Sequence, residues 1–261
     1  MNILKKVVRK SCYLLIALGV SGCGPSALAE AELGKLVFDD QFDQSGPLKG
    51  YTTHNKTALP SIKAKDGRYY APVEANPRDI TLHFNQSQGR LDAQKVRFPF
   101  VVIARNIGIG KLDQPQQAPG SDNEPYLFAG VQVHVLDLDE RTSSHVVVGH
   151  RGAHMNTVEG KNTIDGHSWV DDVGVNKAPA ARADIMIEGS ADRKLKVFWQ
   201  PPNTTPEKSK DRWVPYNNMG ELPGDKPAYG EEVYVGLITY AAGKTGLPFA
   251  GTADRFQIYQ R

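Results

Sequence analysis

The chain has 261 residues, enough to bury a substantial core, and carries 31 basic and 29 acidic residues. Four of the cations lie in the first ten positions, in a segment that we expect to be removed, which leaves 27 basic against 29 acidic residues. That balance excludes the strongly basic surface on which nucleic-acid binding depends. The two cysteines, Cys12 and Cys23, lie near the N-terminus, so we expect a domain without a disulfide bond.

The N-terminus has the two parts of a secretion signal. Residues 1–10 carry positive charges and no acid, and residues 11–20 are almost wholly apolar. An apolar run of about ten residues is too short to span a bilayer, which takes roughly 20 residues in a helix. We therefore predict a signal peptide over residues 1–22.

The end of this segment, Val20-Ser21-Gly22-Cys23, resembles the lipobox of bacterial lipoproteins, in which an aliphatic and two small residues precede a lipidated cysteine. The resemblance implies that acyl chains on Cys23 hold the exported protein at a membrane. The residue that follows the cysteine is Gly24 and not Asp. In this the sequence resembles Gram-negative lipoproteins that are transferred to the outer membrane. The alternative is an ordinary signal peptide cleaved near Ala27-Leu28-Ala29, which would give a soluble secreted protein.

We expect residues 23–34 to form a tether and residues 35–261 to form one domain whose hydrophobic period is two. Alternating or β-branched segments predict strands at 36–38, 80–84, 131–135, 144–148, 183–187, 194–199, 233–240 and 255–259. The 25 Gly and 17 Pro punctuate them, and no stretch is typical of a three-turn amphipathic helix. The pattern predicts an all-β fold, an antiparallel β-sandwich or jelly roll with long loops.

Two hairpins are predicted within this pattern. One joins Val131–Asp139 to Ser144–Gly149 through residues 140–143, and the other joins Ala183–Glu188 to Lys194–Gln200 through residues 189–193. Irregular segments are expected at 113–125, 151–179 and 201–227. Loops of this length in a compact domain are usually functional or disordered.

The first and last predicted strands carry a family resemblance. Residues 36–43 resemble the first strand of concanavalin A-like lectin/glucanase sandwiches, and residues 233–240 and 253–259 resemble their last two strands. Residues 183–185 with 195–199 are similar to paired back-sheet strands of that fold. The resemblance implies a concanavalin A-like scaffold that faces carbohydrate, although a fold does not by itself define a function.

Members of this superfamily that hydrolyse glucans carry an E-x-D-x-x-E strand, which this sequence lacks. Its alginate lyases use a Q-x-H strand, and Gln132-Val133-His134 matches those three positions. The companion R-x-E-L-R motif is missing, and Tyr240–Lys244 is only distantly similar to the lyase segment that supplies the catalytic tyrosine. The resemblance thus implies a saccharide-facing strand and leaves a lyase activity open.

Alternation places Gln132 and His134 on one face of their strand and the neighbouring valines on the other. With Asp139 opposite Ser144, Gln132 would lie across from Arg151, whose guanidinium can bind a carboxylate or sulfate with two hydrogen bonds. We therefore predict a glycan-binding patch that contains Gln132, His134 and Arg151, with an anionic polysaccharide as a suitable ligand.

Aromatic and histidine clusters offer further candidates. Trp213, with Tyr216 beside it, is expected to be exposed and to stack on a sugar ring. Five of the seven histidines lie between His134 and His167, but their spacing favours hydrogen-bonded surface histidines over a metal site. In residues 162–172, carboxylates beside Trp169 favour a polar loop, with a Ca²⁺ or sugar site as the alternative. No other cofactor is expected.

Three functions remain open. The first is an envelope lipoprotein whose sandwich binds a polysaccharide or another glycan. The second is a polysaccharide lyase or hydrolase on the same scaffold. The third is a structural envelope protein that binds other proteins.

The anchor can be tested by changing Cys23→Ala. We expect the variant to be released from membranes, because the apolar segment is too short to hold the protein and the acyl chains supply stable attachment. Metabolic labelling with a palmitate analogue should mark the wild-type protein and not the variant. A wild-type protein that takes up no label would contradict the lipoprotein prediction.

Overall fold

The computed structural model describes residues 33–74, 76–79, 89–119, 126–151, 155–171, 176–202, 211–242, 244–245 and 248–261. The predicted signal peptide, Cys23, most of the tether, the strand expected at 80–84 and His154 lie outside these residues. In the part of the chain that is described, no helix is long and apolar enough to cross a membrane. The helical turns η1 (Lys56–Ala58) and η2 (Tyr216–Asn218) are single 3₁₀ turns.

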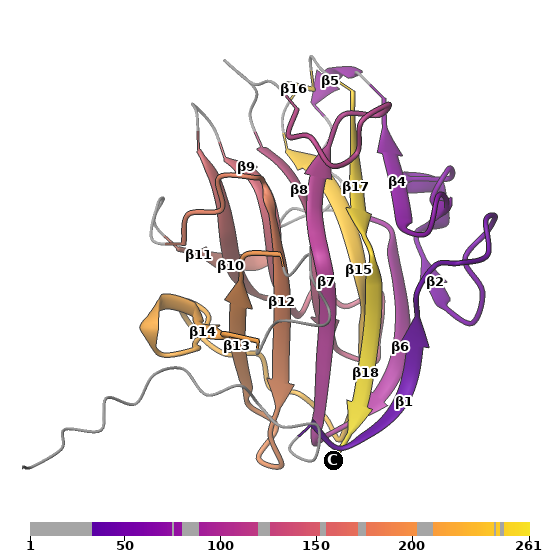
Figure 1. Ribbon diagram of the computed structural model, residues 1–261. Helices are drawn as coiled ribbons and strands as arrows, with labels where there is room; N and C mark the ends of the chain where they lie inside the picture. Colours follow the sequence, from indigo (N-terminus) through magenta and orange to yellow (C-terminus); the bar gives the residue numbers. More distant parts are fainter. Residues whose placement is uncertain are drawn as a thin grey trace, which may run out of the picture.

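Nine strands form one layer, called here sheet A, which lies in front in Figure 1. Its order is β14 (Val214–Pro215), β13 (Leu195–Gln200), β12 (Arg182–Gly189), β7 (Phe100–Gly110), β17 (Phe249–Ala253), β4 (Tyr69–Val73) and β3 (Lys63–Ala64). Beside these, β18 (Arg255–Gln260) pairs with β7, and β1 (Lys35–Asp40) pairs with β18. The first and last strands of the described chain are therefore neighbours.

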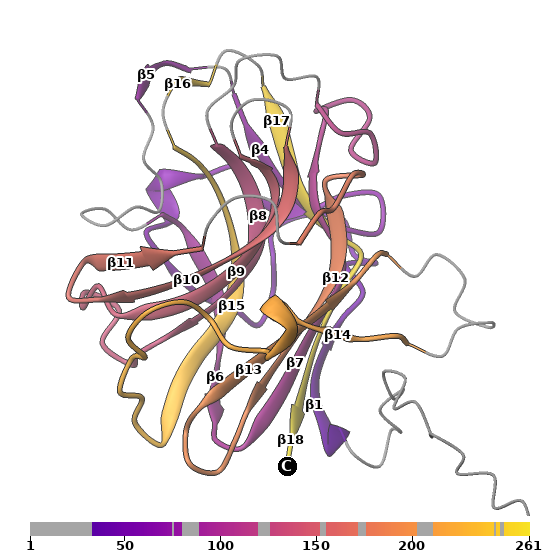
Figure 2. The ribbon, with the colours of Figure 1, turned by 90° about the vertical axis from the view of Figure 1, so that its left-hand side faces the viewer.

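The second layer, sheet B, has seven strands. Their order is β11 (His167–Val170), β10 (Asn156–Ile164), β9 (Ser143–Arg151), β8 (Tyr126–His134), β15 (Glu232–Ala242), β6 (Leu91–Arg97) and β2 (Thr52–His54). Figure 2 views the layers from the side, with β10 and β11 projecting away from β1 and β18. A short pair, β5 (Asn76–Asp79) with β16 (Lys244–Thr245), stands at one end.

A single large core lies between the two sheets. It is built from alternate residues of each strand, for example Leu127, Ala129, Val131 and Val133 of β8, which are all fully buried. The period of two that predicts strands from the sequence is thus the period with which side chains enter this core. The expected all-β class is confirmed, because all the paired strands of both sheets run antiparallel.

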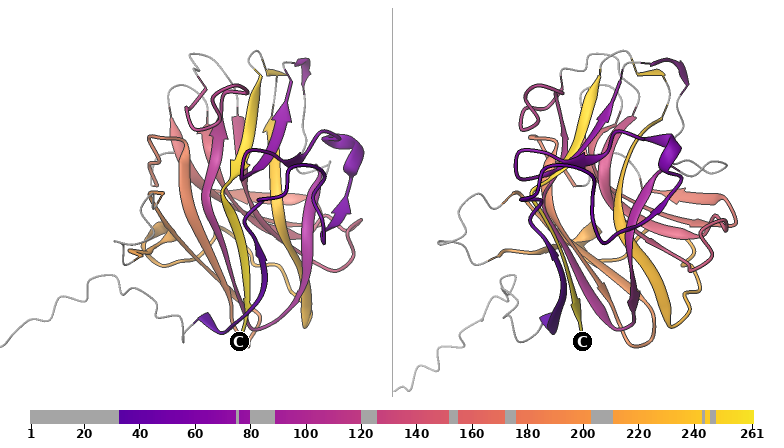
Figure 3. Two further views of the ribbon diagram at one scale, coloured as in Figure 1. Left: turned by 45° about the vertical axis from the view of Figure 1, so that its right-hand side comes forward. Right: turned by 90° about the vertical axis from the view of Figure 1, so that its right-hand side faces the viewer.

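The two ends of the sandwich differ. The C-terminus and the beginning of β1 lie together at the lower end in both views of Figure 3, and β5 and β16 lie at the upper end. The β12–β13 turn also lies at the lower end (Figure 1). Both predicted hairpins form, and Gly189 pairs with Leu195 beside the second turn as expected within one residue.

The predicted register of the first hairpin is wrong. Strand β8 ends at His134, which pairs with Ser143, so residues 135–142 form the connection in place of 140–143. The Asp139 N–H donates to the Asp137 carboxylate (3.0 Å), and the Glu140 N–H donates to the Asp137 carbonyl (3.2 Å). This local turn uses residues that alternation had assigned to the strand. The shift is an even number of residues, so each side chain keeps its face.

The expectation of an irregular segment from 151 to 179 is also wrong, because it contains β10 and β11. These strands form a hairpin whose two turn residues are Asp165 and Gly166, with φ values of +48° and +80°. Positive φ at both positions is the geometry of the two-residue turns that Asp-Gly favours. A positive φ also occurs inside β7, where Asn106 has a φ of +48°.

Candidate functional site

The face of sheet B that points away from the core, called here the outer face, carries the predicted site residues. Gln132 and His134 both lie on it, opposite Val131 and Val133, as alternation predicts. Directly paired residues share a face, so His145 of β9 and Lys161 of β10 continue the row that begins at Gln132. The outer face therefore concentrates polar groups on the central strands of the sheet.

Gln132 is the least satisfied polar residue of this row. Its side chain is only 1% exposed, and neither its Nε2 nor its Oε1 has a hydrogen-bond partner among the described residues. On the β15 side it faces Gly236, where an added Cβ would lie 2.2 Å from the Asp92 carbonyl oxygen. A buried amide without partners costs about 1–3 kcal/mol. The position beside Gly236 thus holds both unused hydrogen-bonding capacity and a place without a side chain.

His134 is held as a neutral imidazole. Its side chain is 1% exposed, and Nδ1 donates to the Val135 carbonyl oxygen (2.8 Å), which assigns the proton of the neutral ring to Nδ1. Burial lowers the pKa of His134 in spite of that hydrogen bond, and the neighbouring His54 lowers it further. The partly buried Tyr234 is its direct neighbour on β15. A neutral histidine beside a tyrosine is an arrangement that can exchange protons.

An aromatic row follows β8 toward the upper end of the outer face. The Tyr240 ring lies 5.5 Å from that of Phe128 and 5.8 Å from that of His145, centroid to centroid. Tyr240 and His145 belong to the two strands that flank β8, and the straight path between them crosses Gly130, which has no side chain to separate them. Phe128 in turn stacks on Tyr126, which is 40% exposed. The row thus reaches the surface at Tyr126.

Three charged residues lie on the β9 and β10 part of the outer face. Arg151 Nη1 lies 3.1 Å from Glu159 Oε2, and Arg151 also donates to the Asp171 carbonyl. Burial raises the pKa of Glu159, against the influence of Arg151 and Lys161. Burial lowers the pKa of Lys161 to about 8, against the attraction of Glu159. One acid and two bases leave this region with a positive balance at neutral pH.

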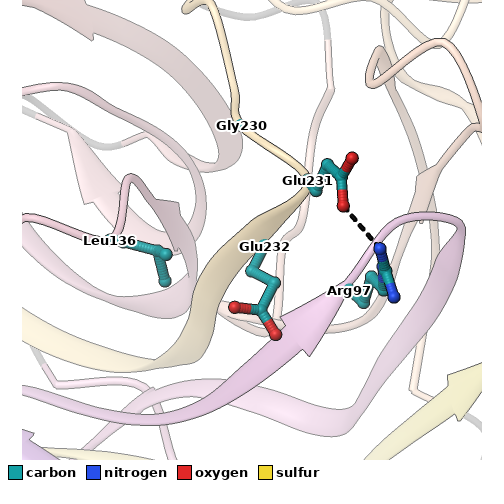
Figure 4. A pocket seen from close by; sticks show the side chains of 5 residues that line it. All are labelled: Arg97, Leu136, Gly230, Glu231 and Glu232. Atoms are coloured by element: carbon teal, nitrogen blue, oxygen red, sulfur yellow. Dashed lines mark hydrogen bonds and ion pairs between the residues drawn. The ribbon is translucent and has the colours of Figure 1, made fainter.

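The outer face opens at its lower end. A groove of about 440 Å³ lies there, lined by Arg97, Leu136, Gly230, Glu231 and Glu232. Figure 4 shows Leu136 on one side, the Arg97–Glu231 ion pair on the other and Glu232 between them. Glu232 is two residues from Tyr234 along β15, about 7 Å, so the groove adjoins the last row of the outer face.

Arg151 does not lie where the sequence predicts. It pairs with Tyr126 across the hairpin, and Gln132 pairs with His145. Six residues of β8 separate Tyr126 from Gln132, a distance of roughly 20 Å, so Arg151 and Gln132 occupy different parts of one face. The cause is the early turn after His134, which moves the register of the whole hairpin.

The predicted exposure of Trp213 and Tyr216 is wrong. Trp213 is 4% exposed and packs on the outer side of sheet A with Val101 and Met186, under the Arg105 guanidinium at 5.1 Å. Tyr216 is fully buried in the core, where its hydroxyl accepts the Gly160 N–H (2.6 Å). Both rings are covered by distant segments of the chain, and neither can stack on a sugar from solvent.

Three of the clustered histidines are not the surface residues that their spacing favours, whereas His167 is exposed as predicted. His134, His145 and His150 are buried, and within the described residues no three His, Cys, Asp or Glu side chains form a group that could hold a metal ion. Residues 162–171 form the end of β10 and β11, where Trp169 is partly buried and contacts His167 edge-on at 4.6 Å. Asp172 lies outside the described residues, and Ca²⁺ binding there stays a prediction.

The described outer face offers no carboxylate pair for glycoside hydrolysis, which needs two acids about 5–10 Å apart. On the described parts of β8, β9, β10 and β15, its acids are Glu159 and Glu232. Three strand spacings and about six residues separate them, roughly 25 Å. Glu159 and Lys161 were missed by the sequence analysis, where their charged alternation was the only signal. His145 was considered there only within the histidine cluster, and Tyr240 only within the segment distantly similar to that of the lyases.

No family model and no curated protein sequence matches this chain. Among solved structures, the fold is similar to a mutant of the GH43 protein BlXynB from Bacillus licheniformis, with a TM-score of 0.55, 12% identity and coverage of 85% of this chain and 39% of that one. It is also similar to LamAcat from Zobellia galactanivorans (TM-score 0.51, 11% identity, 89% and 100% coverage). A xylan β-1,4-xylosidase from Bacillus halodurans gives a TM-score of 0.52 at 13% identity (89% and 41% coverage).

The chain therefore spans about two fifths of the two Bacillus proteins and all of LamAcat. At these identities the likeness concerns the fold. It confirms the expected fold class, an antiparallel β-sandwich of the jelly-roll type.

The buried amine of Lys161 predicts a pH-dependent stability. Its pKa is 10.5 in an ordinary environment and about 8 in the folded protein, so between these values the unfolded chain binds more protons. The free energy of unfolding should therefore rise as the pH increases across this window. This gain is lost as the pH falls toward 8, where the buried amine becomes charged in the folded protein. In Lys161→Met we expect this rise to disappear, with the variant more stable than wild type at neutral pH and the difference shrinking as the pH approaches 10.5.

Urea unfolding of both proteins at a series of pH values measures the effect. Lys196→Met is the matched control, because Lys196 is exposed, and it should follow the wild-type profile. If Lys161→Met and the wild type show parallel pH profiles, Lys161 is not a buried amine of lowered pKa.

Proposed function

We propose that this protein is a cell-envelope lipoprotein that binds an acidic polysaccharide through the outer face of sheet B. The observation that carries the proposal is the buried amide of Gln132, both of whose polar atoms lack a partner in the part of the chain that the structure describes. Buried polar groups in folded proteins are almost always hydrogen-bonded, and an exception calls for an explanation. A ligand hydroxyl or carboxylate that reached this amide would satisfy both of its ends.

The rest of the outer face fits a chain of sugar acids that extends beyond Gln132. Tyr126, which is 40% exposed, offers an aromatic face of the kind that stacks on the apolar faces of sugar rings. Arg151 and Lys161 give the face its positive balance, and a guanidinium is suited to a carboxylate or sulfate. The names of the similar structures agree with a glycan partner, since one is a xylan β-1,4-xylosidase. This agreement adds to the site argument and does not replace it, because one fold supports many functions.

The lipid anchor belongs to the same proposal. Cys23 would carry the acyl chains, residues 23–34 would lead to the sandwich, and the outer membrane of a Gram-negative bacterium would be the location. Attachment through a lipid leaves both sheets accessible to a polysaccharide on the same surface.

A second candidate function is β-elimination on a uronate-containing polysaccharide. The specific observation in its favour is the pairing of His134 with Tyr234, beside the strand that carries Gln132. In such a reaction the neutral His134 would accept the C5 proton, Tyr234 would donate a proton to the departing oxygen, and Gln132 would hold the carboxylate. The products are an unsaturated uronate and a new chain end.

This activity has a direct assay. If the protein is a lyase, incubation with polyuronates should raise the ultraviolet absorbance of the unsaturated product. Tyr234→Phe should abolish that rise while leaving polysaccharide binding intact. Binding without any rise in absorbance for the wild type would assign the site to binding alone.

The proposed binding site predicts an unusual response to Gln132→Leu. The substitution keeps the volume of the side chain and removes a buried amide that has no partner, so we expect the thermal midpoint to rise. Affinity for the acidic polysaccharide should fall by about tenfold or more, because the ligand loses the hydrogen bonds of the amide. The mature chain, residues 23–261 with Cys23→Ser, can be screened on a glycan array and then titrated calorimetrically.

Gln200→Leu is the matched control. Gln200 is also buried, but its Nε2 donates to Asp184 (3.0 Å) and Asp211 (2.9 Å), and its Oε1 accepts the Arg212 N–H (2.6 Å). The same substitution there should lower the thermal midpoint and leave binding unchanged. A Gln132→Leu protein that loses stability, or that binds every glycan as the wild type does, would refute the proposed site.

A further inference from the structure

A second cavity lies at the lower end of the sandwich, away from the outer face of sheet B. It has a volume of about 590 Å³ and is called here the end cavity. Its walls are the β12–β13 turn, the segment from Glu221 to Tyr229, the inner ends of β9 and β10, and the C-terminal Arg261. This volume is in the range of pockets that bind small molecules.

The charges at its mouth do not balance. Its lining has three acids, and each is paired: Glu188 with Arg261 (3.2 Å), Asp192 with Lys194 (2.8 Å) and Glu221 with Lys226 (4.0 Å). Two cations of the lining, Arg193 and Lys196, are left without an ion pair among the described residues. The mouth therefore has a net positive charge of +2 from its side chains, a count of five bases against three acids.

The interior of the end cavity is suited to an apolar ligand. Its polar groups are already joined in a chain: the Tyr229 hydroxyl donates to Ser144 (2.7 Å), Ser144 donates to Asn162 (2.6 Å), and Asn162 donates to the Pro223 carbonyl (2.9 Å). The remaining lining includes Leu195, Leu222 and Pro227. A sugar placed there would find its hydroxyl groups without partners, which is costly in a buried site.

We propose that the end cavity binds an acidic amphiphile, with its acid group between Arg193 and Lys196 and its apolar chain against Leu222 and Pro227. The surplus of cations at the mouth favours an anionic group. The polar groups of the cavity floor are already hydrogen-bonded, so the floor favours an apolar chain. This site is separate from the proposed polysaccharide face and goes beyond that function, because it shares no residue with the row around Gln132.

The position of the N-terminal segment points to the membrane as the source of the amphiphile. Gly34 lies against the C-terminus, where an added Cβ would be 3.0 Å from Cγ of Arg261, a residue of the cavity lining. Ten residues lead from Cys23 to Leu33, and they can span at most about 35 Å. With the proposed anchor on Cys23, the mouth of the end cavity would stay close to the bilayer surface.

Calorimetric titration of the mature chain with Cys23→Ser tests the site. The probes are decanoate, inorganic phosphate and an uncharged octyl tetraethylene glycol ether. Decanoate and the ether are used below their micelle-forming concentrations. We expect saturable binding of one decanoate, with phosphate and the ether binding more weakly because each offers only half of the chemistry. Phosphate binding as tight as decanoate would overturn the amphiphile assignment.

The double variant Arg193→Asn/Lys196→Gln removes the two surplus cations, and asparagine is chosen because position 193 has a φ of +61°. Decanoate affinity should fall about tenfold or more. Lys35→Gln is the matched control, an exposed cation at the same end that does not line the cavity, and it should bind as the wild type does. Thermal midpoints of all three proteins establish that the folded state is intact.

Equal decanoate binding by the wild type and the double variant, or no binding by either, would overturn the proposal. Gln132→Leu should retain decanoate binding in full, so failure of the polysaccharide face and failure of the end cavity give different results. Co-sedimentation with phosphatidylglycerol vesicles but not phosphatidylcholine vesicles, relieved by decanoate, would identify the membrane as the source. Decanoate binding without co-sedimentation would support the same site for a free amphiphile.

Discussion

The inward packing of β8 is the constraint on which the candidate site depends. Val131 and Val133 are fully buried between the sheets, so the residues between and after them must point to the opposite face. No shift of register by an even number of residues can reverse this, because the side-chain period of a strand is two. Gln132 and His134 are therefore on the outer face as a direct consequence of where the valines go. The core decides which polar residues are brought together, even though none of them belongs to it.

The outer face of sheet B also carries a cost in stability. The amide of Gln132 is buried without partners, and the amine of Lys161 is buried deeply enough for its pKa to fall to about 8. The ion pair of Arg151 with Glu159 offers little compensation, since the desolvation of a buried pair can equal its attraction. Apolar residues at these positions would make a more stable sheet. Groups that reduce stability at one face of a well-packed sandwich are what a ligand-binding site requires, because the ligand supplies the interactions that the fold leaves out.

Local pattern accounts for the parts of the structure that could be predicted from sequence. The strands around Val131, Ile185, Val235 and Ile258 alternate clearly, and the faces of their side chains follow from that alternation. The register after His134 could not be predicted, because it depends on a side-chain turn at Asp137 that competes with strand pairing. Strand β10 was missed since its outer face is charged, a pattern that usually indicates solvent. The burial of Trp213 was missed because the residues that cover it come from elsewhere in the chain. The sequence around Trp213 therefore gives no signal of that burial.

The pairing of polar groups distinguishes the places where this sandwich could bind something from those where it is only held together. On sheet A, Arg105 meets the carboxylates of Asp184 and Asp211, and Gln200 bridges the same two acids, so that network is closed and structural. At the end cavity the polar groups of the floor are also hydrogen-bonded to one another. Among the described residues of its lining, only Arg193 and Lys196 are cations without an ion pair. On the outer face of sheet B, hydrogen-bonding capacity is left over within the described residues, in the Gln132 amide beside Gly236 of the next strand. A surplus of charge over an apolar floor calls for an ion with an apolar chain, whereas an unsatisfied amide among aromatic rings calls for a ligand that can both donate and accept. The two proposed sites would therefore select different chemistry, and a glycan at one would not compete with an amphiphile at the other.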